Sequence, residues 1–132
     1  MITRISHIGI AVRDLNAAKK LYTQLLQTEP SDNEVVPEQK VKVAKFKVGE
    51  STIELLEPTS EDSPIAKFIN KRGEGIHHIA YESDKIQDDL NRLDSQGFEL
   101  INKEPVAGSD NMRIAFIKPG SAAGVLTEIC QH

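Results

Sequence analysis

An internal repeat constrains the fold of this chain more than any other feature of its sequence. The segment HIGIAVRDLNAAKKLYTQL begins at His7, and the segment HIAYESDKIQDDLNRL begins at His78, 71 positions further on. Each contains a histidine, an apolar strand-like run, an acidic residue and an amphipathic helical pattern. Near the end of each half a glutamate lies among apolar residues, Glu54 in TIELLEP and Glu128 in LTEIC, 74 positions apart. We therefore expect two similar structural modules in one chain.

Local signals predict the same order of elements in both halves. Apolar residues at helical spacing predict two helices, one capped by Asp14 and one opened by Asp84 and ended by Gly97. A shorter helix over 63–72, with Ser63 as its N-cap, connects the halves. Runs rich in β-branched and apolar residues predict strands over 2–12, 31–36, 40–48, 51–57, 75–83, 98–101, 112–118 and 124–129. Each half thus reads β-α-β-β-β.

The composition narrows the class of protein. A chain of 132 residues with 39% hydrophobic and 27% charged residues is typical of one globular domain. The net charge of −4 gives no electrostatic reason to expect nucleic acid or an anionic membrane as a partner. The single cysteine, Cys130, excludes an internal disulfide. Because the sequence shows neither a signal peptide nor an apolar run of about 20 residues, we expect a cytoplasmic protein.

The adjacent histidines of GEGIHHIAY can be separated by strand parity. Neighbouring side chains of a strand point to opposite faces, so His78 shares a face with Ala80, and His77 lies on the other face. His7 shares its face with two small residues, Gly9 and Ala11, which leaves space for a cavity. The repeat aligns His78 with His7. We therefore expect His78 to face a site and His77 to be a packed or partly exposed histidine.

Two histidines and two glutamates, one pair from each half, indicate a divalent metal site. Imidazole and carboxylate together suit Zn²⁺, Co²⁺, Ni²⁺ and Mn²⁺, and four protein ligands leave open positions for a substrate oxygen. Taken singly, each histidine fits a core position and each glutamate an edge-strand position at least as well. The repeat relates all four, and this favours the metal site formed by His7, Glu54, His78 and Glu128.

At these residues the sequence resembles the vicinal oxygen chelate superfamily, and within it the methylmalonyl-CoA epimerase family. The resemblance covers nearly the whole chain, and EDSPIAKFI followed by GEGIHHIA is its most specific part. It implies one domain over 1–132, with module 1 at about 1–58, the linker helix at about 63–72 and module 2 at about 74–131. The implied fold is α+β, with two tandem βαβββ modules that form a curved, partly closed mixed sheet around a metal site and helices outside.

The resemblance also implies a function. The expected activity is interconversion of the (R) and (S) forms of methylmalonyl-CoA through abstraction of the α-proton and an enolate stabilised by the metal. The implied metal ligands are the same four residues, although some members carry Gln at the position of Glu54. One divalent ion per chain is expected, Co²⁺ in vitro, with Mn²⁺, Ni²⁺, Zn²⁺ and Mg²⁺ as alternatives. An acyl-CoA substrate and a homodimer are the expected partners.

Inversion of a carbon centre needs proton transfer on both faces. Glu128 is the expected proton-transfer group on one face. Some epimerases have a glutamate where this chain has Val43, which cannot transfer a proton. Lys45, Glu38 or a bound water could replace it, and the sequence does not select among them.

Two other functions fit the same sequence. A glyoxalase I-type lactoylglutathione lyase would use the same four ligands, although the segments EDSPIAKFI and IELLEP favour the epimerase. A non-enzymatic ligand-binding member of the superfamily is the other alternative, and such binders often lack the metal residues that this chain retains.

Overall fold

The computed structural model describes all residues, 1–132. The helices are α1 (Leu15–Leu26), α2 (Pro64–Arg72) and α3 (Ile86–Ser95). The strands are β1 (Ile2–Ala11), β2 (Glu34–Val36), β3 (Val41–Val48), β4 (Ser51–Pro58), β5 (Gly75–Ser83), β6 (Val106–Ala107), β7 (Arg113–Ile117) and β8 (Thr127–Gln131). The predicted order of one strand, one helix and three strands in each half is confirmed.

The chain divides into two compact units. One comprises His7–His77, and the other comprises Met1–Ser6 together with His78–His132. Strand β1 therefore contributes its first residues to one unit and its last residues to the other.

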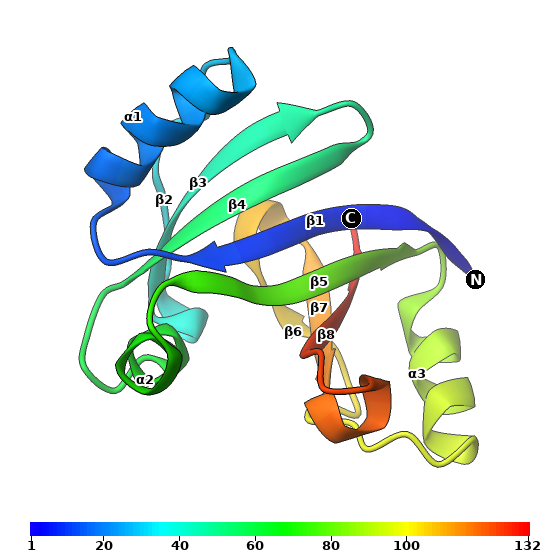
Figure 1. Ribbon diagram of the computed structural model, residues 1–132. Helices are drawn as coiled ribbons and strands as arrows, with labels where there is room; N and C mark the ends of the chain where they lie inside the picture. The colour runs from blue at the N-terminus through cyan, green and yellow to red at the C-terminus, as the bar shows by residue number, and fades with distance from the viewer. The chain divides into compact units, whose positions relative to one another are not determined.

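In the unit His7–His77 the strands follow the order β2-β3-β4-β1, and β1 runs parallel to β4 (Figure 1). One face of these strands packs against α1, where Leu15 contacts a cluster that includes Phe46 and Leu55. Helix α1 begins as predicted, because the side chain of Asp14 accepts a hydrogen bond from the backbone N–H of Ala17. The opposite face, near the ends of β1 and β4, packs against α2. The buried residues of this contact are Ala11, Val36, Val41, Val43, Leu56, Ile65 and Ile69.

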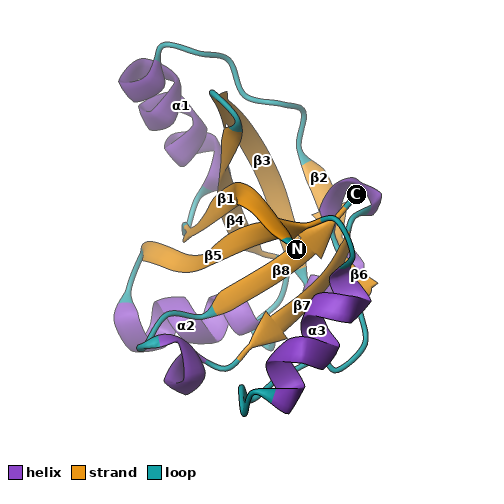
Figure 2. Cartoon of the chain, turned by 90° about the vertical axis from the view of Figure 1, so that its right-hand side faces the viewer, coloured by secondary structure: helices purple, strands orange, loops and turns teal.

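In the other unit β5, β8, β7 and β6 lie in that order, and β5 runs parallel to β8 (Figure 2). Helix α3 covers one face of β7 and β8. The buried residues of this contact are Ile86, Leu90, Leu93, Ala115, Ile117 and Ile129. The helix thus buries one apolar stripe against the sheet, as its sequence pattern predicts.

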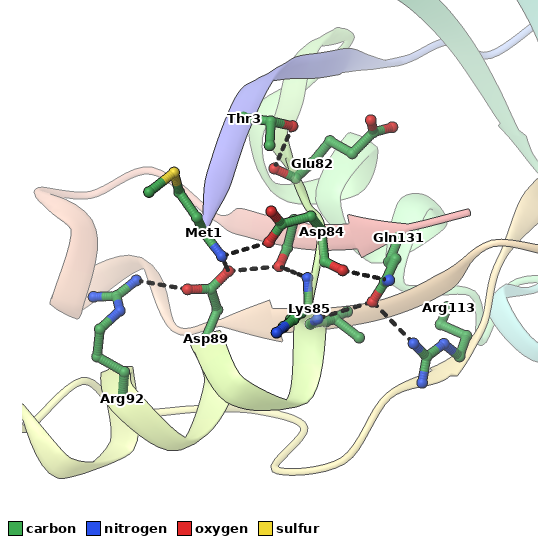
Figure 3. A network of polar contacts seen from close by, with 11 residues as sticks. Met1, Thr3, Glu82, Asp84, Lys85, Asp89, Arg92, Arg113 and Gln131 are labelled. Carbon is green, nitrogen blue, oxygen red and sulfur yellow. Dashed lines mark hydrogen bonds and ion pairs between the residues drawn. The ribbon is translucent and has the colours of Figure 1, made fainter.

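A buried carboxylate ties the first turn of α3 to the start of the chain (Figure 3). Asp89 is 4% exposed, its carboxylate accepts a hydrogen bond from the hydroxyl of Ser83, and the N-terminal ammonium of Met1 lies 3.0 Å from it. Arg92 donates to its second oxygen. Burial by itself raises the pKa of Asp89, but these donors outweigh it and hold the pKa below its usual value.

The same end of α3 is fixed by a glutamine from β8 (Figure 3). The side-chain oxygen of Gln131 accepts hydrogen bonds from the backbone N–H of Ile86 and from Arg113, and its amide nitrogen donates to the carbonyl of Asp84. This side chain takes the place of an N-cap, because Lys85 at the cap position makes no side-chain hydrogen bond.

Three details of the predicted elements are wrong. Asp84 does not open α3, since the helix begins at Ile86 and Lys85 occupies the cap position. The range 98–101 is not a strand and contributes one isolated bridge, Leu100 to Ile117, whereas the short strand β6 lies at Val106–Ala107. The last strand begins at Thr127 rather than at Gly124, because a 3-10 helix over Pro119–Ala122 lengthens the preceding turn.

None of the helices is both long and apolar enough to cross a lipid bilayer.

Candidate metal centre

His7 and Glu54 form a histidine–carboxylate pair within the unit His7–His77. His7 lies on β1, and Glu54 lies on the adjacent parallel strand β4, where its register partner is Gly9. Nδ1 of His7 is 3.6 Å from Oε2 of Glu54, and the two side chains are 3% and 6% exposed. The small partner Gly9 leaves room on this face, which lets two polar side chains lie next to each other under the surface.

His78 and Glu128 form the corresponding pair in the other unit. His78 lies on β5, and Glu128 lies on the adjacent parallel strand β8, opposite Ala80. Nε2 of His78 is 3.2 Å from Oε1 of Glu128, and each side chain is 5% exposed. The ring of His78 also packs edge-on against Phe116, with the ring centroids 5.7 Å apart.

The two pairs have the same strand register. In each unit the glutamate is the parallel partner of the residue two positions after the histidine, which is Gly9 for Glu54 and Ala80 for Glu128. Side chains two positions apart on a strand share a face, so each histidine and its glutamate point to the same side of their strands. The sequence repeat is therefore a repeat of geometry around these two pairs.

The units differ at the residue across from each glutamate. On the antiparallel neighbour, Lys45 of β3 is the register partner of Glu54, and Phe116 of β7 is the register partner of Glu128. Nζ of Lys45 is 3.7 Å from Oε2 of Glu54, and its side chain is 17% exposed. We call each histidine–glutamate pair, with the residue opposite its glutamate, a half-site. The half-site of Glu54 thus includes the ammonium group of Lys45, whereas the half-site of Glu128 includes the aromatic ring of Phe116.

Val43 and His77 take up structural positions. Val43 is 2% exposed and belongs to the apolar cluster against α2, on the same strand as Lys45 and two positions before it. His77 packs edge-on against Phe68 of α2, with ring centroids 5.1 Å apart. Parity therefore separates the adjacent histidines as predicted, since His78 is buried beside Glu128 and His77 contacts a helix.

The donor set suits a divalent ion on chemical grounds. Imidazole nitrogen and carboxylate oxygen are the ligands that Co²⁺, Zn²⁺, Ni²⁺ and Mn²⁺ share. Buried carboxylates are costly unless a cation or hydrogen-bond donor accompanies them, and both glutamates are buried. The residues His7, Glu54, His78 and Glu128 therefore fit a metal ion by type and by burial.

Two contacts of the site were not predicted from the sequence, that of Lys45 with Glu54 and that of Phe116 with His78. Lys45 was expected only as a possible proton-transfer group, although it contacts the predicted ligand Glu54. Phe116 was not singled out, although its ring packs on His78. Strand register could have predicted both contacts. When β3 and β7 are aligned as equivalent strands, Lys45 lies opposite Glu54 and Phe116 lies opposite Glu128.

Comparisons with known proteins agree on a family. The sequence profile of the glyoxalase/bleomycin resistance protein/dioxygenase superfamily matches residues 6–116. The chain is 37% identical over 133 residues to an ethylmalonyl-CoA/methylmalonyl-CoA epimerase of Cereibacter sphaeroides, with 99% of each chain covered.

Solved structures give the same result. A variant of Streptomyces coelicolor methylmalonyl-CoA epimerase in complex with 2-nitronate-propionyl-CoA matches with a TM-score of 0.95 and 39% identity, over 99% of this chain and 95% of that one. A hypothetical protein from Bacillus halodurans C-125 matches with a TM-score of 0.94 and 46% identity, over 98% and 94% of the two chains.

Proposed function

The chain belongs to the methylmalonyl-CoA epimerase family of the glyoxalase/bleomycin resistance protein/dioxygenase superfamily, and we propose that it interconverts (R)- and (S)-methylmalonyl-CoA. The observation that carries this proposal is the identical register of the pairs His7–Glu54 and His78–Glu128 in two modules of one chain. Relatives named as methylmalonyl-CoA epimerases match the chain over nearly its full length, which supports the same substrate class.

We propose that His7, Glu54, His78 and Glu128 together hold one divalent ion per chain. Co²⁺ is the ion we expect to serve in vitro, and Mn²⁺, Ni²⁺, Zn²⁺ and Mg²⁺ are alternatives. When bound, such an ion would supply Lewis-acid stabilisation of the negative charge that develops on the thioester oxygen as the α-proton leaves.

The chain's own contribution to proton transfer is assigned to Glu128. Its carboxylate can take the α-proton of one isomer, while a group on the opposite face of the carbon supplies the proton that completes inversion; in the reverse direction Glu128 returns its proton to the carbon. His78, 3.2 Å from Oε1 of Glu128, limits the rotation of that carboxylate, and the ring of Phe116 supports His78 from its edge. Glu128 and His78 are buried, which limits the access of bulk water to the carboxylate.

For the group on the opposite face of the carbon centre, we rank the three candidates that the sequence left open. Val43 lies in an apolar cluster and offers no proton. Glu38 is exposed in the turn that precedes β3, whereas Lys45 is directly opposite Glu54. We therefore place Lys45 ahead of Glu38, with a bound water as the remaining candidate.

Chelation and reloading test this function. The protein is treated with chelator and reloaded with Co²⁺, and conversion of one methylmalonyl-CoA isomer into the other is followed by chromatography. We expect activity that disappears with chelator, returns with Co²⁺ and is lost in His7→Ala. The hemithioacetal of glutathione and methylglyoxal serves as the alternative substrate. Turnover of that compound alone would contradict the epimerase and favour the lyase.

Assembly and the CoA contacts are expected from the family. We propose a homodimer, measurable by light scattering after gel filtration. We propose four cations as candidate contacts for the CoA phosphates. Arg113 donates a hydrogen bond to Gln131. The other three, Lys67, Lys71 and Arg72, lie on α2.

A further inference from the structure

The two half-sites are equivalent in backbone and unequal in charge. The residues opposite the glutamates, Lys45 and Phe116, are 71 positions apart, the same interval that separates the histidines. The backbone N–H of Lys45 donates to Oγ of Ser31, and that of Phe116 donates to Oδ1 of Asn102, again 71 positions on. The scaffold therefore holds both positions in the same way, and the difference is confined to the side chain.

Lys45 and His7 approach the same atom. Oε2 of Glu54 is 3.7 Å from Nζ of Lys45 and 3.6 Å from Nδ1 of His7. The Lys45 side chain is 17% exposed and the Glu54 side chain 6% exposed, so that water screens this ion pair less than a surface pair. Any cation that binds Glu54 must share its carboxylate with an ammonium group.

We propose that the ammonium group of Lys45, besides its candidacy for proton transfer, lowers the affinity of the site for divalent ions. The proposal rests on the proposed function, because it takes Glu54 and His7 as metal ligands. In metal-free protein the ammonium of Lys45 neutralises the buried carboxylate and stabilises the fold. In metal-loaded protein the same ammonium repels the ion and reduces the effective charge of its ligand. The half-site with Phe116 carries no such penalty.

Metal affinity measured by titration calorimetry tests the proposal directly. Chelator-treated protein is titrated with Co²⁺ at low ionic strength, as wild type and as Lys45→Met, because methionine fills a half-buried position of this length without charge. We expect the dissociation constant of K45M to be at least tenfold lower than that of the wild type, which corresponds to about 1.4 kcal/mol. Added salt should narrow the difference.

Two variants provide matched controls. Lys45→Arg keeps the positive charge, and its dissociation constant should stay within about threefold of wild type. Lys47→Met removes a lysine from the same strand and the same face, opposite Thr52 and exposed, and should leave the constant unchanged. Thermal unfolding provides a second measurement: metal-free K45M should melt below the wild type, and Co²⁺ should raise its melting temperature by more.

The outcomes separate this inference from the proposed function. Equal dissociation constants for wild type and K45M, with binding lost in His7→Ala, would overturn the role of Lys45 and leave the metal site intact. A weaker site in K45M would overturn it as well. Binding of Co²⁺ to K45M alone would support it strongly. Binding to neither protein would overturn both the role of Lys45 and the metal site on which it depends.

Discussion

At the scale of single residues, three buried carboxylates each have a polar or charged partner. Glu54, Glu128 and Asp89 are all buried carboxylates, and each lies against a histidine, lysine, hydroxyl or ammonium group. A buried carboxylate without such partners would be strongly unfavourable. Two of these three belong to the candidate metal centre, whereas Asp89 holds the first turn of α3 in place.

Replacement of Asp89 should remove a contribution to the free energy of unfolding that is present at neutral pH and lost at acidic pH. The pKa of Asp89 is lower in the folded chain than the value near 3.9 of an unfolded aspartate, so its ionised form stabilises the fold above about pH 4. This contribution is lost as the pH falls through the folded pKa. We expect Asp89→Asn to lower the free energy of unfolding by about 1.5–3 kcal/mol at pH 7.

Urea unfolding followed by circular dichroism measures the effect at pH 7 and at pH 3. The gap between wild type and D89N should narrow at pH 3. Asp88→Asn is the control, because Asp88 lies in the same helical turn and is exposed. A gap of equal size at both pH values would show that the asparagine acts through packing rather than through charge.

At the scale of elements, caps and packing faces account for most of the fold. Ser63 caps α2 by accepting a hydrogen bond from the backbone N–H of Ile65, and it is fully buried. Helix α2 in turn carries Ile65 and Ile69 into the cluster that contains Val43. The cap therefore supports the face of the sheet next to the candidate metal centre.

Loss of this cap should destabilise the protein. We expect Ser63→Ala to lower the free energy of unfolding by about 0.5–2 kcal/mol, since one backbone N–H loses its acceptor in a buried position. Denaturant unfolding of S63A and of Thr59→Ala, an exposed residue in the same loop, provides the comparison. A larger loss in T59A than in S63A would contradict the role assigned to the cap.

The sequence predicts elements where one local signal dominates. The caps Asp14 and Ser63 were predicted because their residue type and position suffice. The start of α3 was not, because its capping group comes from Gln131, which is distant in sequence. The pairing of Lys45 with Glu54 depends on the register of β3 and β4, which residue composition does not specify.

At the scale of the whole molecule, the internal repeat accounts for the order of the elements in each half and for the two histidine–glutamate pairs. His7, Glu54, His78 and Glu128 were predicted from the repeat, and within each unit one histidine lies next to one glutamate in the same strand register. The difference between Lys45 and Phe116 could not be interpreted from the repeat alone, because its meaning depends on which side chain each residue contacts.

Metal binding should stabilise the folded chain as a whole. A ligand that binds only the folded state at 100 times its dissociation constant adds about 2.7 kcal/mol to the free energy of unfolding. We expect chelator to lower the melting temperature of metal-loaded protein and Co²⁺ to restore it. His7→Ala should show neither response, whereas His132→Ala, which removes an exposed histidine, should respond as wild type does. Equal responses in both variants would contradict the assigned ligands.

The central claim is proton transfer by Glu128 at the α-carbon of methylmalonyl-CoA, and exchange of that proton in D₂O tests it most directly. Proton NMR should show loss of the α-proton signal with Co²⁺-loaded wild type and no loss after chelation. In Glu128→Gln, which keeps an oxygen ligand and lacks the base, we expect exchange at least about 100-fold slower with Co²⁺ still bound. Exchange no faster than the spontaneous rate in metal-loaded wild type, or full exchange in E128Q, would contradict the account.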